Sequence, residues 1–426
     1  MVLSFLLLSC ATAALAGNHS YISRDVVVIG GGSSGTHAAF RLRQEGLSVA
    51  LLERGNRLGG HVNTFRVPNT NTSFDFGVIF YHNISVASNY FSALGVDIIA
   101  APSGGTSVST YADINGDAKA TTLVPPSMPW ANSTAVTTAT EKYVNLYNTQ
   151  FSFLDDGFNF PDPVPEDILL PWADFMAKYG LDPISFSAYK YFSSLTAGGF
   201  LGIGPALITT ADFNNQGIYD KALEKLGEGE GAFLNVTINH ITRDEGGVSV
   251  TMKTPYGGEQ TVRAKQLIIA IPPVVADLRA VGLDLSAEEE HLFGQASFRW
   301  YFDAVIRNSG LPDDIALSNI DFTKPDGIPI APQIVLAVGQ VGLTTGVPGL
   351  QSLYYSSDRN ISNTDAQADI LATLARYRAA NGLDTSVKTE FVGFHNHEPF
   401  ELTVPVDVIR KGYYKERNKL QGCRNT

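Results

Sequence analysis

The hydrophobic pattern near the N-terminus predicts a β-α-β unit. Residues 25–29 (DVVVI) form a short apolar, β-branched run, which is typical of a strand buried on both faces. A glycine-rich stretch at 30–35 follows, and residues 36–46 then favour a helix that packs on a sheet and ends at Gly46. Residues 48–53 (SVALLE) repeat the buried-strand pattern. Two strands joined by a helix within about thirty residues imply a parallel sheet.

The pattern changes between about residues 90 and 225. Aromatic and Pro/Asp-rich stretches alternate there with helix candidates at 173–180 (ADFMAKYG) and 219–227 (YDKALEKLG). We expect an inserted, mainly helical segment that leaves the sheet and returns to it.

Strand-like runs return after this insertion, at 232–244, 247–254 and 259–273. Residues 254–259 (TPYGGE) predict a hairpin turn between the last two runs. Pro272-Pro273 should end the third strand, because proline cannot donate to a sheet ladder.

The last third of the chain predicts a second set of strands. Strand-like runs occupy 299–308, 332–341 and 350–357, and a helix at 365–382 should end at Gly382. The glycine-rich segment 196–206 lacks both a strand-to-helix context and a lysine, so we do not interpret it as a phosphate loop. We therefore predict an α/β fold in which a parallel-sheet domain carries an inserted α+β domain.

Composition and charge narrow the classes of partner. The 426 residues are 44% hydrophobic and 17% charged, which describes a globular protein of two or three domains. The net charge of -12 argues against nucleic acid and against an anionic membrane surface, because both require a basic face.

The first sixteen residues resemble a secretory signal peptide. An apolar stretch ends in Ala14-Leu15-Ala16, a small-x-small pattern, and it is too short to span a bilayer; a buried N-terminal strand or helix is the alternative. Nowhere else does the sequence approach the length that a membrane span requires. We therefore expect a secreted or secretory-lumen protein with a signal peptide at 1–16. Six N-x-S/T sequons are predicted glycosylation sites in that compartment: Asn18, Asn71, Asn83, Asn132, Asn235 and Asn360. Removal of the signal peptide would leave Cys423 as the only cysteine, so no internal disulfide is expected.

The glycine-rich stretch carries a dinucleotide-binding pattern. Gly30-x-Gly32-x-x-Gly35 follows a predicted strand and opens a predicted helix. Gly30 permits a tight turn, Gly32 lets the backbone approach a pyrophosphate, and Gly35 allows close helix packing. The free N–H groups and the helix dipole then favour phosphate.

Glu53 strengthens this interpretation. It ends the second strand, 18 residues after Gly35, where a carboxylate can accept hydrogen bonds from an adenosine ribose. A solvated surface glutamate is the alternative. Strand, loop, helix, strand and acid together predict a dinucleotide site.

The residues that follow Glu53 resemble the flavin-dependent amine oxidase superfamily. Glu53, Arg57, Gly59 and Gly60 reproduce its E-x-x-x-R-x-G-G pattern, and residues 74–80 (FDFGVIF) are similar to its D-x-G segment beside the flavin. Further similarity lies in residues 234–241, where Ile238 occupies the position that the family usually fills with an adenine-contacting valine. The resemblance implies FAD as the cofactor.

Within that superfamily, the chain most resembles fungal proteins of the β-cyclopiazonate dehydrogenase type, which close an alkaloid ring by flavin-mediated oxidation. The resemblance implies a Rossmann-like FAD-binding domain with an inserted substrate domain. We assign 17–90 and 226–280 to the first, with 396–426 as an incomplete last part of it, and 91–225 and 281–395 to the second.

Two positions depart from the family pattern. His61 follows the glycine pair where amine oxidases more often carry arginine, and its hold on the cofactor would differ. The family also ends with a glycine-containing strand, an acidic residue and a helix that faces the flavin ring. Nothing after residues 412–422 resembles this element, so we expect a truncated sequence or a diverged last segment.

Three functions remain open. We favour an FAD oxidoreductase that moves a hydride from an apolar small molecule to flavin N5, with oxygen or another electron acceptor to reoxidise it. A redox-neutral double-bond isomerase and a non-catalytic truncated chain are the alternatives. No catalytic residue can be named. We expect no metal site, because His395 and His397 share a strand face but no third ligand is evident, and His82 stands apart.

Overall fold

The computed structural model describes residues 21–101, 107–188, 207–324, 326–329, 337–338 and 347–426. The predicted signal peptide, Asn18 and segment 196–206 lie outside these ranges, as does most of the predicted strand at 332–341.

The first sheet contains the predicted β-α-β unit. Its strand order is β10-β2-β1-β13-β12-β11, in which the first four strands are parallel and the last two extend the sheet as antiparallel neighbours. The bounds are β1 Tyr21–Ile29, β2 Val49–Leu52, β10 Ala232–Phe233, β11 Thr237–Asp244, β12 Gly247–Lys253 and β13 Glu259–Ile269. The predicted hairpin at 254–259 connects β12 to β13. Because a parallel core needs crossover connections, the chain leaves this sheet after β2 and returns to it at β10.

Both faces of this sheet are covered, which explains the unbroken apolar run in β1. Val26 and Val28 pack in one core with Ala39 of α1 (Ser33–Gln44) and Ala222 of α6 (Gln216–Leu226). Val27 and Ile29 face a second core, which includes Leu278 of α7 (Val275–Ala280). A strand buried on both faces gains by being apolar at every position.

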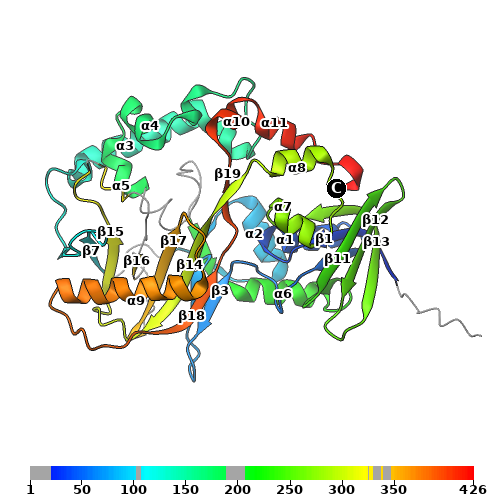
Figure 1. The fold of residues 1–426 in the computed structure, drawn as a ribbon, viewed down its shortest axis with the longest axis horizontal. Helices are drawn as coiled ribbons and strands as arrows, with labels where there is room; N and C mark the ends of the chain where they lie inside the picture. The colour runs from blue at the N-terminus through cyan, green and yellow to red at the C-terminus, as the bar shows by residue number, and fades with distance from the viewer. Residues whose placement is uncertain (1–20, 102–106, 189–206, 325, 330–336, 339–346) are drawn as a thin grey trace, which may run out of the picture.

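The second sheet has the strand order β18-β14-β17-β16-β15-β7-β8, and β19 pairs with one end of β14. Figure 1 shows it beside the first sheet, on the side away from β11 and β12. Its bounds are β7 Val108–Ala112, β8 Ala120–Thr121, β14 Ser297–Arg307, β15 Ile315–Asn319, β16 Ala337–Val338, β17 Leu350–Ser357, β18 Glu390–Asn396 and β19 Phe400–Thr403.

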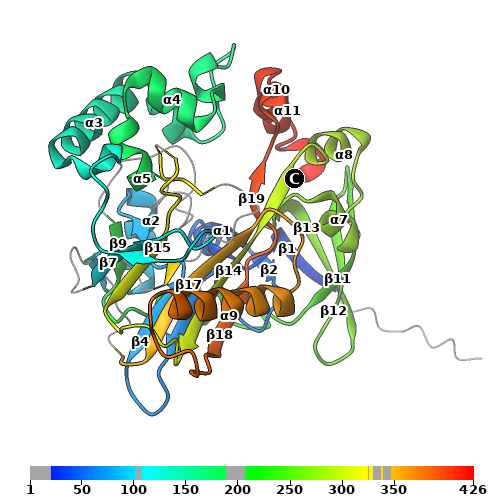
Figure 2. The ribbon, with the colours of Figure 1, turned by 60° about the vertical axis from the view of Figure 1, so that its left-hand side comes forward.

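Helix α9 (Asn363–Ala380) lies across one face of the second sheet (Figures 1 and 2). Phe302, Ala304 and Ile306 of β14 pack in one core with Ile370 and Leu374 of α9. Because side chains alternate along a strand, the residues between them, including 303, face the opposite side of the sheet. That side packs against β4, where Val305 meets Phe74 and Phe76.

The insertion at 91–225 is less uniformly helical than its sequence predicted. Strand β7 pairs in parallel with β15, so part of the insertion completes the second sheet. The remaining strands are β3 Asn63–Arg66, β4 Ser73–Gly77, β5 Tyr81–His82, β6 Ile98–Ala100 and β9 Leu207–Thr210. The remaining α-helices are α2 Ser85–Leu94, α3 Ser133–Leu146, α4 Trp172–Tyr179, α5 Ser185–Ala188, α8 Ala287–Phe293, α10 Val406–Arg410 and α11 Tyr413–Asn418.

The C-terminal part of the chain, from β19 onward, contacts both sheets. β19 belongs to the β14 ladder, whereas Arg243 of β11 donates to Thr426 Oγ1 and Asn425 donates to Asp244 O. None of these three contacts tests the predicted domain limits, which stay a prediction.

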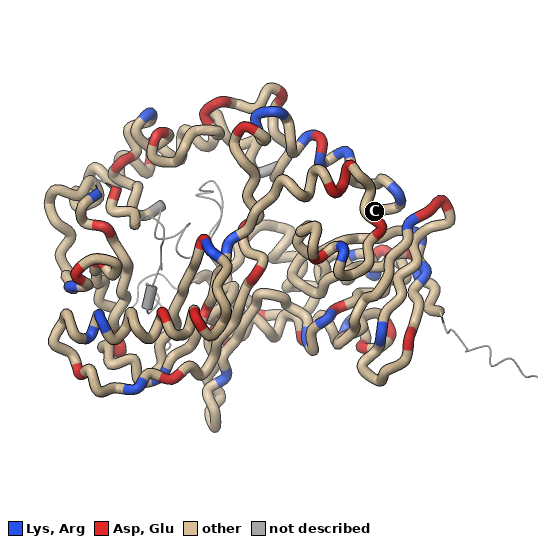
Figure 3. Tube along the Cα trace, viewed as in Figure 1, with Lys and Arg blue, Asp and Glu red and all other residues tan. Residues whose placement is uncertain are grey.

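Charged side chains are distributed over the whole fold. In Figure 3, lysine and arginine alternate with acidic residues along the trace and form no long basic tract in the described part of the chain. Among the described helices, none has the length and hydropathy required to cross a bilayer.

Candidate functional site

The glycine-rich loop connects β1 to α1 as its spacing predicted. Gly30 has φ +101°, in the region that favours glycine, and it makes the turn out of the strand. A Cβ on Gly35 would overlap the carbonyl oxygen of Gly30, so only glycine lets the helix approach this closely. A Cβ on Gly32 would meet nothing within 4 Å, so this part of the loop faces open space.

The N-terminus of α1 provides donors at that open space. Gly32 is the N-cap and no side chain caps the helix, so the first N–H groups have no capping partner. The first turn also contains no acidic residue. Ser33 Oγ lies 2.5 Å from Tyr219 Oη, and Thr36 Oγ1 donates to Gly31 O at 2.9 Å, which fixes the loop. Uncapped N–H groups at a positive helix end are suited to phosphate oxygens.

Glu53 lies beside this loop, at the carboxyl end of β2. Its Oε2 accepts from Gly31 N at 2.6 Å, and its Oε1 accepts from Gly55 N at 2.7 Å. Each carboxylate oxygen can accept a second hydrogen bond, so the ribose hydroxyls of an adenosine still find acceptors here. Two backbone N–H groups thus fix the Glu53 carboxylate, and its contact with a ribose stays a prediction.

The glycine pair packs directly on the same loop. Gly59 N donates to Gly31 O at 2.8 Å. A Cβ on Gly60 would lie 3.0 Å from Gly32 Cα, and both glycines of the pair have positive φ. The E-x-x-x-R-x-G-G segment and the G-x-G-x-x-G loop therefore form one continuous cradle, and its binding of adenosine and pyrophosphate stays a prediction.

Arg57 is held by protein groups beneath this cradle. Its guanidinium donates to Gln216 Oε1 at 2.6 Å and to Asn63 Oδ1 at 2.9 Å. Burial lowers the pKa of Arg57 from its ordinary value, although the site leaves it a cation. Arg57 thus ties the cradle to α6 and β3 and contributes positive charge below it.

Ile238 lies in β11 with its side chain 9% exposed in the second core of the first sheet. Val236 N, two residues earlier, donates to Glu53 O at 3.1 Å, so this segment runs beside the acid that should hold the ribose. Asn235, which the sequence placed inside a strand, instead lies in the bend between β10 and β11 with φ +55°.

The D-x-G segment carries backbone strain. Asn215, which is fully buried, donates from Nδ2 to Val78 O and Ile79 O, each at 2.9 Å, and Asp75 Oδ1 accepts from Asn215 N at 3.0 Å. These bonds hold Val78 at φ +48°, which is unfavourable for a β-branched residue. Strain of this kind costs about 1–3 kcal/mol and is concentrated at functional sites.

His61, directly after the glycine pair, leads to a cluster of histidines of which His397 is buried and His61 and His395 are partly buried. Its ring centroid lies 4.5 Å from that of His397, and His397 Nε2 lies 2.6 Å from Asp303 Oδ2. Burial lowers the pKa values of His61, His395 and His397 to about 4, so these imidazoles are neutral at pH 7. Burial raises the pKa of Asp303.

Several residues of this region were not identified from the sequence. Asn63, Gln216 and Asn215 position the cradle but carry no motif of their own. Asp303 had one signal, since it is the only charged residue in the run WYFDAVI (300–306). It supplies the third ligand-type side chain that His395 and His397 lacked.

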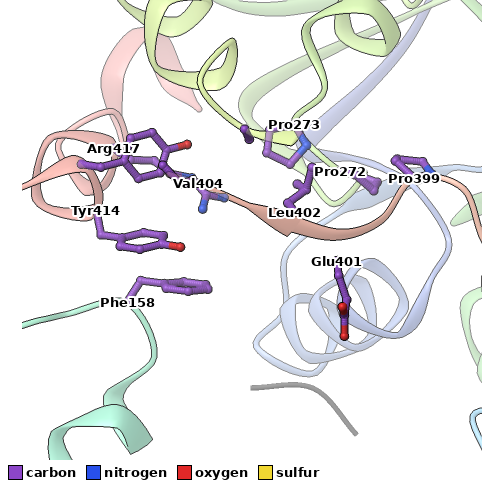
Figure 4. A pocket seen from close by; sticks show the side chains of 11 residues that line it. Phe158, Pro272, Pro273, Pro399, Glu401, Leu402, Val404, Tyr414 and Arg417 are labelled. Atoms are coloured by element: carbon purple, nitrogen blue, oxygen red, sulfur yellow. The ribbon is translucent and has the colours of Figure 1, made fainter. Parts of the chain in front are cut away.

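A cavity of about 320 Å³ lies next to the nucleotide cradle (Figure 4). Pro272 and Pro273, which follow β13, form one wall, and Ile271 just before them packs against Gly30. The rings of Phe158 and Tyr414 stack 4.4 Å apart at the other end. The remaining lining residues are Ala296, Pro399, Glu401, Leu402, Val404, Tyr413 and Arg417.

The predicted glycosylation sites in the described ranges are all exposed: Asn71, Asn83, Asn132, Asn235 and Asn360. Exposure is a requirement for modification, and their glycosylation stays a prediction. Cys423 is exposed and unpaired.

Solved structures with the same fold include an isomerase and an oxidase. A fatty acid isomerase from P. acnes aligns with a TM-score of 0.68 at 16% identity, covering 95% of this chain and 92% of that chain. Putrescine oxidase bound to putrescine aligns with a TM-score of 0.59 at 19% identity, covering 92% and 90%. At these identities the likeness shows the fold alone, which is that of the amine oxidases.

Sequence comparison identifies the family. The profile of the NAD(P)-binding Rossmann-like domain matches residues 28–94. The β-cyclopiazonate dehydrogenase of Aspergillus oryzae is 32% identical over 95% of this chain and 88% of its own length. An FAD-dependent oxidoreductase of Emericella nidulans is 30% identical over 95% and 86%. The chain therefore belongs to the family of fungal FAD-dependent oxidoreductases that includes β-cyclopiazonate dehydrogenase, and FAD is its cofactor.

Proposed function

We propose that this oxidoreductase oxidises an apolar, nitrogen-containing small molecule, of the alkaloid type, at the carboxyl edge of the first sheet. One observation carries the proposal: the glycine loop, Glu53 and the Gly59-Gly60 pair converge on that edge, beside an apolar cavity. FAD, when bound, supplies an acceptor for a hydride at N5 of its ring.

The residues of the nucleotide cradle bind and orient rather than react. The N–H groups at the start of α1 would hold the pyrophosphate, and Glu53 would accept from the ribose hydroxyls. Neutral His61 offers a hydrogen bond where an arginine of other amine oxidases would offer a charge. The strained segment at Val78 would fix backbone beside the ring without a side chain in between.

The cavity supports an apolar substrate. Proline and aromatic side chains form most of its wall, and its volume suits a small ligand that must be shielded from water. Glu401 and Arg417 are its charged members. Burial raises the pKa of Glu401, so this carboxylate can accept the proton that leaves a substrate N–H when the adjacent C–H gives up a hydride. Oxygen or another acceptor would then take the two electrons that left the substrate with the hydride.

The relatives' names support oxidation over a redox-neutral reaction. One relative is named a dehydrogenase and another an FAD-dependent oxidoreductase. The second candidate is a double-bond isomerase, which is favoured by the alignment with the fatty acid isomerase. The product distinguishes them, because dehydrogenation removes two hydrogens from the substrate and isomerisation leaves its mass unchanged.

We also propose that the chain enters the secretory pathway. The apolar N-terminal stretch supports this, and so does the exposure of the sequon asparagines at five positions. Its substrate and electron acceptor would then be encountered in that lumen or outside the cell.

The proposal is tested by the visible spectrum of the purified protein, followed by anaerobic titration with indole alkaloids and with unsaturated fatty acids. We expect flavin absorbance that acid releases, and bleaching by an alkaloid. A folded but colourless protein would contradict the cofactor assignment. Bound flavin that no alkaloid bleaches, with a fatty acid isomerised instead, would favour the second candidate.

A further inference from the structure

Three metal-ligating side chains meet on one face of the second sheet. Asp303 of β14 lies directly opposite His395 of β18 in the antiparallel register. His397 N donates to Tyr301 O at 2.9 Å, which continues the same ladder past the end of β18. Because opposite residues share a face and faces alternate along each strand, positions 303, 395 and 397 point to the same side.

The distances among them are compatible with a shared ion. One ligand-type atom from each residue lies within 4.8 Å of those of the other two. The closest pair, Asp303 Oδ2 and His397 Nε2, is 2.6 Å apart and shares a hydrogen bond. Ligands at about 2.1 Å from a zinc-sized ion are roughly 3–3.5 Å from one another, so rotation of the side chains suffices and the strands can stay in place.

Two atoms of the cluster lack partners. Asp303 Oδ1 and His395 Nδ1 are shielded from solvent and form no hydrogen bond with the described residues. Asp303 itself is 0% exposed. A buried carboxylate oxygen without a partner is costly, and it usually marks a ligand, an ion or a water. A cation at the centre of the three side chains would satisfy both atoms at once.

We propose that Asp303, His395 and His397 bind a divalent transition-metal ion of the zinc and iron(II) class. Two imidazoles and one carboxylate are a donor set that these ions prefer, and three protein ligands leave a coordination position open. Arg57 is a nearby cation, and its positive charge would repel the metal ion. Its guanidinium is already held by Gln216 and Asn63, which fixes it in these contacts.

Such an ion would lie where the second sheet meets the segment that follows the nucleotide cradle. His61, from the segment that follows the nucleotide cradle, packs with its ring 4.5 Å from that of His397. The ion would fix β14 to the segment after β18 on the side that meets this histidine. Retained metal is measured directly, so ion occupancy can be determined both with and without bound flavin.

The test uses the full chain without a histidine tag and with Cys423→Ser, because the exposed thiol could itself bind zinc. The protein is dialysed against Zn²⁺ and then against metal-free buffer, and retained metal is measured by atomic emission. Co²⁺ is titrated in parallel and its visible absorption recorded. We expect about one ion per chain in the parent protein. Asp303→Asn and His395→Gln should lose it, whereas exposed His240→Ala should retain it.

A parent protein that retains no zinc and gives no Co²⁺ bands would overturn the proposal. So would an ion that persists in both cluster variants, since it would then be bound elsewhere. If a cluster variant does not fold, the Co²⁺ spectrum of the parent decides. Intense bands displaced by Zn²⁺ support the site, and a spectrum equal to that of aqueous Co²⁺ contradicts it.

Discussion

At the scale of single residues, the site depends on side chains whose hydrogen bonds are fixed by backbone groups. Glu53 is held by Gly31 and Gly55, and Val78 is held in its strained conformation by Asn215. Both arrangements rest on hydrogen bonds within the chain itself, so substitution of Glu53 or Val78 tests each of them directly.

Glu53→Ala should weaken FAD binding about 10–100-fold, because a charge-assisted hydrogen bond is worth roughly 1.5–3 kcal/mol. Flavin occupancy after purification and a fluorescence titration of added FAD measure the change. Glu245→Ala, at an exposed turn, is the matched control and should bind normally. Equal flavin occupancy in Glu53→Ala and the parent would refute the ribose assignment.

Val78→Gly should raise the free energy of unfolding by about 1 kcal/mol, because relief of strain exceeds the entropy that glycine adds to the unfolded chain. The control is Val86→Gly, at an exposed position of α2, which should lower stability by about 0.4 kcal/mol. Urea denaturation of both variants provides the measurement. A loss of stability in Val78→Gly as large as that in Val86→Gly would show that Val78 is not strained.

At the scale of elements, a buried ion cluster fixes β11 to the segment before α8. The Arg243 side chain is 0% exposed and binds Glu289 Oε1 at 2.6 Å and Asp284 Oδ1 at 2.7 Å. Ser286 and Glu289 also form a capping box that starts α8. One glutamate thus serves both the helix N-terminus and the buried arginine.

Glu289→Gln should destabilise the protein by about 3 kcal/mol, because it leaves Arg243 with one carboxylate fewer in a buried site. Burial opposes ionisation of Glu289, but the bonds from Arg243 and Ser286 outweigh it and the net pKa lies below 4.5. A lowered carboxyl pKa contributes stability above pH 4.5, and this is lost as pH falls through the folded-state pKa.

Thermal denaturation from about pH 3 to pH 7 measures this contribution. The melting temperature of the parent should fall below pH 4.5, and Glu289→Gln should show a weaker dependence from a lower starting value. Glu288→Gln, exposed on the same helix, should behave like the parent. Parallel pH curves for the parent and Glu289→Gln would contradict this assignment.

At the scale of the whole molecule, the first and the second sheet meet beside the nucleotide cradle. The glycine-rich loop, Glu53 and the Gly59-Gly60 pair lie at the edge of the first sheet. Asp303, His395 and His397 lie on the second sheet. His61 links the two, since it follows the glycine pair and packs on His397. The nucleotide-binding features and the histidine cluster are therefore neighbours in space, although they are far apart in sequence.

Expression in a secreting eukaryotic host should yield a protein that loses mass on enzymatic removal of N-glycans, because the described sequon asparagines are exposed. Mass spectrometry before and after digestion measures the number of glycans. A chain that carries Asn→Gln at all six sequons is the control and should not change in mass. A secreted parent without any glycan would contradict the modification, and retention in the cytosol would contradict the secretory assignment.

Much of the nucleotide site could be predicted because its signals are local. The turn at Gly30, the close packing at Gly35 and the position of Glu53 all follow from a strand, a loop and a helix within about thirty residues. The hairpin at 254–259 and the helix that ends before Gly382 were equally local and are confirmed. In contrast, the strand expected through Asn235 is wrong, because tertiary contacts with Glu53 and Gly55 bend the chain there.

By itself, the sequence determined the cradle for the cofactor, because backbone conformation and helix packing select glycine and acid at fixed spacings. Alternation along β14 places Asp303 on the face opposite Phe302 and Ala304. Only the tertiary structure decided what that side would meet. Pairing of β14 with β18 brings Asp303 to His395 and His397, across 94 positions in the case of His397. Strand register is set by packing of the whole sheet, and no local pattern in either strand specifies its partner.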